Sequence, residues 1–208
     1  MRCFRFILLL QLFATVLFSQ TIDAYIHPEG KTNKLTYFTP SKAGGKSALS
    51  YTTWFSEFRG DNFYMVETTF MKDKPIKITT SKIKCDGNKA LLLQTVSTTM
   101  FETNVKRVYS TPKVFLILPN DKMVESWSET DNSGDLWHFS SERVELEIGG
   151  EFLTAIKVTK KHSEIDTKMF QYYVDGIGLW NVKFSDLSDY MILETQEIDP
   201  EAVNYDDY

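Results

Sequence analysis

Cysteine is nearly absent from this chain: its 208 residues include only Cys3 and Cys85. Cys3 lies in the first twenty residues, which have the composition of a removable leader, so the remainder is expected to form no internal disulfide. An Asn-x-Ser/Thr glycosylation signal is also missing, because Asn132 is followed by Ser133 and Gly134. Together these absences favour a bacterial periplasmic or secreted protein over an animal extracellular one.

The sequence also has no long hydrophobic run. Its longest apolar stretch, residues 6–18, covers 13 positions, whereas a membrane-spanning helix needs roughly 20. This stretch follows Arg2 and Arg5 and ends in polar residues, which is the pattern of a signal peptide. The sequence therefore predicts a signal peptide over residues 1–20, export to the periplasm or the outside of the cell, and a protein that is not integral to the membrane.

Positive charge is in deficit. The formal net charge is −5, and it becomes −7, from 21 basic and 28 acidic residues, once the first twenty residues are removed. Nucleic-acid binding relies on a clustered Lys and Arg surface, so no nucleic-acid partner is predicted. The last stretch, Glu194 to Tyr208, has six acids and no base, and residues 197–208 are predicted to form an acidic flexible tail.

Short runs rich in Thr, Val, Ile, Tyr and Phe alternate with turn residues from Leu49 onward, which indicates β-strands. No long stretch keeps the apolar spacing of a helix. Residues 21–34 are predicted to be irregular, residues 35–196 to form one β domain, and Leu35 to Phe38 to hold a short strand. Further strands are predicted near 48–58, 63–71, 76–84, 90–100, 105–109, 113–118, 123–129, 136–148, 152–161, 168–175, 177–184 and 189–196.

One hairpin has a register that its residues predict. Val144 and Ile156 belong to apolar faces of successive strands that flank Gly149-Gly150-Glu151. A three-residue loop places Val144 opposite Ile156 and keeps the acidic side chains off the apolar face, so this loop is predicted. It also places Arg143 opposite Lys157, a like-charge pair that counts against it.

Several strands are apolar on both faces, so a flat sheet with one wet face does not account for them. With no strong helix to cover the sheet, the predicted fold is all-β, a single antiparallel meander that forms a curled open barrel or a two-layer sandwich. These apolar side chains either fill an ordinary core or line a cavity for a ligand. The residues predicted to line such a cavity are Trp54, Phe58, Phe63, Met65, Phe115 and Trp180.

Two segments carry a resemblance to a group of uncharacterised exported bacterial β-rich proteins. The first runs from Tyr37-Phe38-Thr39-Pro40 through Gly44-Gly45 to Tyr51, and the second, more specific one is Tyr172-Tyr173-Val174-Asp175-Gly176-Ile177-Gly178-Leu179. Together they cover about a quarter of the chain. The resemblance implies a periplasmic or outer-surface β domain, with distant kinship to the open half-barrels of periplasmic lipoprotein carriers, and it implies no catalytic residues.

No assembled catalytic, cofactor or metal motif is found. Gly176-Ile177-Gly178 lacks the third glycine and the following helix of a phosphate loop, so it is interpreted as a bend in a strand. Cys85 begins a turn and is interpreted as an unpaired thiol. The cluster from His162 to Asp166 is interpreted as a charged hairpin tip because no second cluster at a metal-binding spacing supports it.

The sequence therefore predicts an exported, non-enzymatic protein, without cofactor, that binds a lipid or another apolar small molecule, or an envelope protein. Two alternatives remain at this point. One is a structural or interaction domain of the envelope that uses an exposed strand edge. The other is a hydrolase of envelope lipid or glycan, in which His138 would act with Glu142 or Asp135.

Overall fold

The computed structural model describes most of the chain after the predicted signal peptide, which itself lies outside the described residues. Backbone but not side chains is described for 33–40, 46–49, 54 and 189–198. Within the described part, no helix is long and apolar enough to cross a membrane. The described ranges are 21–26, 33–40, 46–56, 59–72, 74–120, 123–131, 133–166, 168–185 and 189–198.

In the part of the chain that the structure describes, twelve antiparallel strands form one sheet, which confirms the predicted all-β fold. Each expected strand is found, but the two predicted near 105–109 and 113–118 are parts of a single long strand. The strands are β1 Asn33–Pro40, β2 Lys46–Phe55, β3 Asn62–Met71, β4 Lys74–Asp86, β5 Lys89–Thr99, β6 Val105–Ile117, β7 Glu125–Thr130, β8 Leu136–Ile148, β9 Glu151–His162, β10 Lys168–Val174, β11 Gly178–Phe184 and β12 Asp189–Ile198.

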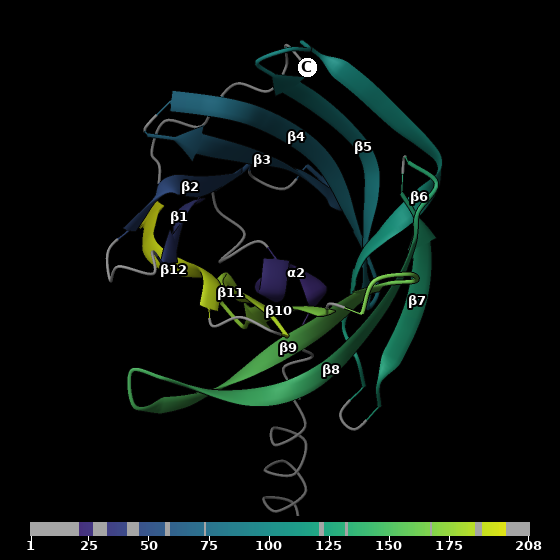
Figure 1. The fold of residues 1–208 in the computed structure, drawn as a ribbon. Helices are drawn as coiled ribbons and strands as arrows, with labels where there is room; N and C mark the ends of the chain where they lie inside the picture. The colour runs from purple at the N-terminus through teal and green to yellow at the C-terminus, as the bar shows by residue number, and fades with distance from the viewer. Residues whose placement is uncertain are drawn as a thin grey trace, which may run out of the picture.

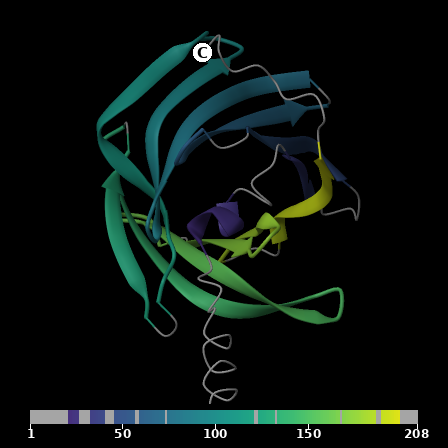
Figure 2. The ribbon, with the colours of Figure 1, turned by 180° about the vertical axis from the view of Figure 1, so that it is seen from behind.

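The sheet consists of two six-stranded meanders, β1–β6 and β7–β12, joined where β1 pairs with β12. It curls so that its outer strands, β6 and β7, come to lie side by side (Figures 1 and 2). These two strands form no ladder, so the barrel stays open at this seam. Side chains bridge the seam instead: Glu129 Oε1 accepts a hydrogen bond from Val114 N at 2.9 Å, and Lys113 Nζ donates to Thr130 O at 2.7 Å.

A short helix, α2 (Ile22–Ile26), lies inside the curled sheet (Figure 1). The prediction of an irregular segment over 21–34 is wrong at this helix and at the start of β1. Five residues are too few for the periodicity of a helix to show in a sequence. Ile22, Tyr25 and Ile26 are all buried, and the backbone N–H of Gly176, in the β10–β11 turn, donates to Ala24 O at 3.0 Å.

The apolar core surrounds α2 at the end of the barrel that holds the β4–β5 and β10–β11 turns. Paired strands place the core residues opposite one another: Phe63 faces Ile83 across β3 and β4, and Tyr173 faces Ile156 across β10 and β9. These four side chains and Tyr25 are buried. The helix thus supplies apolar surface that the twelve strands alone could not provide.

The β8–β9 hairpin departs from its predicted register. The structure pairs Ile148 with Glu151 and Arg143 with Ile156 around a two-residue Gly149-Gly150 turn, in which both glycines have positive φ (63° and 87°). This is the turn geometry that suits a tight hairpin. The prediction of a three-residue loop was wrong because it assumed that the hairpin tip packs on the core.

In the observed register the charges also pair better. Lys157 faces Glu142 instead of Arg143, and its Nζ lies 2.7 Å from Glu142 Oε1. Arg143 points inward, where its Nη1 donates to Tyr25 Oη at 3.3 Å and its Nε donates to Pro119 O at 3.1 Å. Phe152 is left 72% exposed at the tip. The guanidinium of the inward Arg143 therefore has two hydrogen-bond acceptors on the core side of β8.

Candidate functional site

A cavity of about 180 Å³ lies inside the barrel next to α2. Residues from both meanders line it, so it exists only because the sheet curls. An apolar, enclosed pocket with a few convergent polar groups is the usual form of a small-molecule site. Its walls are formed by Ile26, Tyr51, Thr53, Phe55, Met65, Glu67, Phe115, Gln171, Tyr173 and Leu179.

Glu67 is the one acidic side chain in this lining. Residues alternate between the two faces of a strand, and the inward positions of β3 include Phe63, Met65 and Glu67, so the fold carries the carboxyl into the barrel. The Tyr51 hydroxyl, on β2, donates a hydrogen bond to Glu67 Oε1. Burial raises the pKa of Glu67, and the Tyr51 hydrogen bond and the charge of Lys77 only partly oppose it.

Two further polar groups face the cavity from the opposite wall. Gln171 and Tyr173 occupy alternate positions of β10, and both line the cavity. Burial raises the pKa of Tyr173 strongly, and the nearby charge of Glu67 adds to this, so the phenol stays protonated at neutral pH. Among the described residues, none forms a hydrogen bond with the Gln171 amide, which leaves it available to a ligand.

The interior becomes more polar with distance from α2 along β3 and its neighbours. Phe63 faces Ile83, and two residues further along β3 Met65 faces Ser81. Two residues beyond that, Glu67 faces Thr79, whose hydroxyl lies 3.2 Å from the Ser97 hydroxyl. A ligand in this cavity therefore meets apolar groups at the end near α2 and hydrogen-bonding groups at the other end.

The six residues predicted to line a cavity do not share one position in the structure. Met65 and Phe115 line the cavity. Phe63 is buried in the core cluster rather than in the lining, and its ring lies 6.3 Å from that of Phe55. Trp180 is half-buried and is not among the lining residues. The Trp54 side chain and Phe58 lie outside the described residues.

The sequence reasoning missed the polar members of the site. It selected large apolar side chains, whereas Glu67, Tyr51 and Gln171 give the cavity its chemistry. A usable signal was present for Glu67, because it follows Phe63 and Met65 at the spacing of two that keeps a residue on one face of a strand. No comparable signal marked Gln171, since β10 becomes part of the wall only through tertiary packing.

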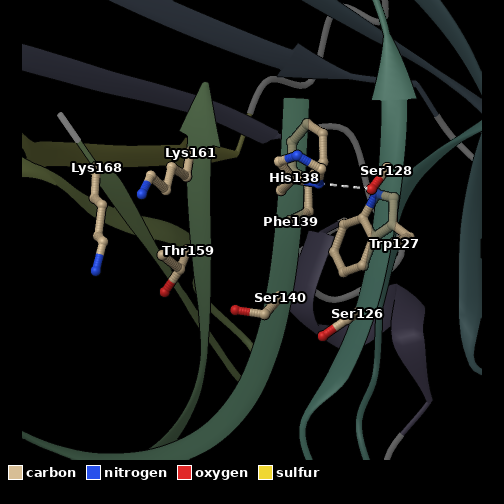
Figure 3. Close-up of a pocket in the computed structure, with 9 residues that line it drawn as sticks. All are labelled: Ser126, Trp127, Ser128, His138, Phe139, Ser140, Thr159, Lys161 and Lys168. Atoms are coloured by element: carbon tan, nitrogen blue, oxygen red, sulfur yellow. Dashed lines mark hydrogen bonds between the residues drawn. The ribbon is translucent and has the colours of Figure 1, made fainter. Parts of the chain in front are cut away.

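A second pocket, of about 390 Å³, lies on the outer surface of β7–β10 and is wide open (Figure 3). The register sets two rows of side chains across these strands. One row is a series of hydroxyls and the other ends in two lysines, an arrangement suited to weak binding of an anion. The rows are Ser126, Ser140 and Thr159, and Ser128, His138, Lys161 and Lys168.

His138 and Ser128 form a hydrogen bond in this pocket, with Nδ1 2.9 Å from Oγ (Figure 3). A serine nucleophile needs in addition a carboxylate that orients the imidazole. Within the described part of the chain, no carboxylate hydrogen-bonds His138, and the two predicted acids lie elsewhere. Glu142 pairs with Lys157, and Asp135 Oδ2 lies 3.9 Å from Nε2 of buried His162. The geometry thus supplies a polar surface pocket without a catalytic triad.

The remaining candidate groups do not build a site. No cluster of three or more metal-ligating side chains occurs among the described residues. Cys85 is half-buried at the end of β4, and burial raises the pKa of its thiol to about 12, so it is a poor nucleophile. Gly176 lies in the β10–β11 turn and Gly178 begins β11, with φ of 71° and 89°, as predicted for a bend.

Comparison with known proteins gives no relative of this chain. No family model, curated protein or solved structure matches it.

Proposed function

We propose that this protein is an exported, non-enzymatic carrier that binds a small amphiphile inside the open barrel. The observation that carries the proposal is the cavity itself, with its apolar walls and single buried carboxyl. A buried carboxyl that only one hydrogen bond among the described residues, from Tyr51, is shown to compensate costs folding energy, and a ligand whose donor group meets it would offset part of that cost. The predicted signal peptide and the resemblance to exported β proteins agree with such a role.

The size of the cavity restricts the ligand. A cavity of about 150 Å³ holds a benzene molecule, so one of about 180 Å³ accommodates on the order of six to ten non-hydrogen atoms. A ligand of this size has its apolar end against Ile26 and Phe55, and its polar end at Glu67. An amine suits this position best, because an ammonium group forms a charge-assisted hydrogen bond with the carboxylate.

Titration calorimetry with hexylamine, hexanol and hexanoate tests the proposal. The three ligands share one apolar chain, and the expected order of affinity is amine, then alcohol, then carboxylate, which Glu67 repels. Glu67→Gln should weaken the amine roughly tenfold, the value of a charge-assisted hydrogen bond, and change the alcohol little. Glu145→Gln is the matched control, because Glu145 is exposed on β8.

Substituting Leu179 by tryptophan provides the steric test. Leu179 is half-buried in the cavity wall, and a larger side chain there fills the space. Binding of all three ligands should then be lost while the protein stays folded. Equal affinity for the three ligands, or unchanged binding by the Leu179→Trp protein, would exclude this cavity as the binding site.

A further inference from the structure

Charge is distributed very unevenly around the barrel. Residues 62–118, which form β3–β6, contain nine Lys or Arg and four Asp or Glu, a net charge of +5. Residues 123–185, which form β7–β11, contain six Lys or Arg and eleven Asp or Glu, a net charge of −5. The acidic protein therefore has one basic side, and a negatively charged surface attracts that side and repels the other.

Part of this basic charge gathers where two hairpins turn. Lys72 and Lys74 flank the β3–β4 turn, and Lys106 and Arg107 follow the β5–β6 turn; all four are exposed. The two turns are neighbours, because β4 pairs with β5 up to Lys77 and Thr99. By sequence the two turns contain two acids, Asp73 and Glu102, against these four basic residues.

The same two turns expose large apolar side chains. Met71 is 49% exposed, Met100 is 68% exposed and Phe101 is 89% exposed. Contiguous exposed apolar groups on a soluble protein mark a contact surface. Met71, Lys72, Lys74, Met100, Phe101, Lys106 and Arg107 are here named the basic tip.

The β5–β6 turn is held in one shape by hydrogen bonds. Thr99 Oγ1 accepts from the backbone N–H of Phe101 at 3.2 Å and of Glu102 at 3.1 Å, and Thr99 N donates to Glu102 O at 2.7 Å. Asn104 N donates to Thr98 Oγ1 at 3.2 Å. These bonds fix the backbone on either side of Phe101. The structure of the turn therefore sets the solvent-exposed position of this ring.

From these observations we propose that the basic tip docks on the surface of a membrane that contains anionic lipid. Exposed lysine and arginine beside exposed aromatic and methionine side chains match the two layers of such a surface, the charged headgroups and the apolar acyl region. The tip is at the opposite end of the strands from α2 and the core. This inference does not depend on the proposed cavity ligand.

Vesicle flotation tests the inference on the chain that starts at Thr21. The protein should float with vesicles of phosphatidylcholine mixed with phosphatidylglycerol, remain behind with phosphatidylcholine alone, and dissociate as salt is added. Phe101→Ser should weaken binding to the mixed vesicles severalfold. Phe152→Ser is the matched control, since Phe152 is similarly exposed but lies at the opposite end of the strands.

A second variant tests the charge. Lys106→Glu with Arg107→Glu should reduce binding by more than tenfold, because each basic residue near an anionic membrane strengthens binding about fivefold. Lys89→Glu, an exposed lysine at the β4–β5 turn and thus at the opposite end of the strands, should leave it nearly unchanged. The inference is overturned if the wild-type protein does not float, if it binds neutral vesicles equally well, or if each variant behaves like its control.

Discussion

Glu67 is the residue on which the chemistry of the cavity depends, and its ionisation lowers the stability of the folded protein. Burial raises its pKa above the ordinary value of 4.5, so the folded protein holds this proton more tightly than the unfolded chain does. By linkage, the contribution of this group to stability is complete below pH 4.5 and is lost as the pH rises through the raised folded pKa.

Glu67→Gln should remove this loss of stability at higher pH. The amide keeps an acceptor for the Tyr51 hydroxyl but never ionises, so at neutral pH the variant should be more stable than wild type by about 1 kcal/mol, the order of cost of an imperfectly compensated buried polar group. Urea unfolding at a series of pH values measures this. A wild-type profile that rises over the same window, or a variant that follows the wild type throughout, would mean that the carboxyl is ordinarily solvated.

The sequence was least informative about which individual residues line the cavity. Met65 and Phe115 were selected because they are large and apolar, and both line the cavity. Phe63 has the same character and the same parity as Met65, and both belong to the core cluster, but only Met65 also lines the cavity. The two residues lie next to each other on the same face of β3, so alternation along the strand gives both the same prediction.

Among the elements, the seam between β6 and β7 determines how far the sheet closes. The Glu129 carboxylate takes the place of a strand carbonyl by accepting from Val114 N at 2.9 Å. Glu129→Ala leaves this N–H without its acceptor and should destabilise the protein by about 1–3 kcal/mol, whereas Glu129→Gln retains an acceptor and should cost less.

Hydrogen exchange of the Val114 amide reports on this bond directly. It should be faster in Glu129→Ala than in wild type and intermediate in Glu129→Gln, while amides in the β3–β4 ladder stay protected. Equal exchange in the three proteins would show that water or the chain itself satisfies this group and that the side chain does not hold the seam.

Strand positions were well predicted from the sequence because alternation and turn residues are local signals. The register between strands was not well predicted, as the β8–β9 hairpin shows. The prediction assumed that Val144 and Ile156 share the core face, but Arg143 occupies that face, where it donates to Tyr25 Oη and Pro119 O. The partner that makes an inward arginine acceptable belongs to α2, more than a hundred residues away in the chain.

For the whole molecule, the curl of the sheet creates both the cavity and the separation of charge. The sequence predicted a curled or layered sheet from strands that are apolar on both faces. It could not indicate that the first and last strands pair, that β6 and β7 are the edges, or that Ile22–Ile26 packs inside as a helix. Each of these depends on contacts between distant parts of the chain.

The central claim, that a small amphiphile occupies the barrel, is tested most directly by native mass spectrometry of the protein purified from an exporting host without detergent. The account predicts a bound molecule of small, defined mass on the wild-type protein and none on folded Leu179→Trp, whose cavity is filled. A wild-type protein that carries no ligand, and that also takes up none of the three six-carbon probes, would contradict it.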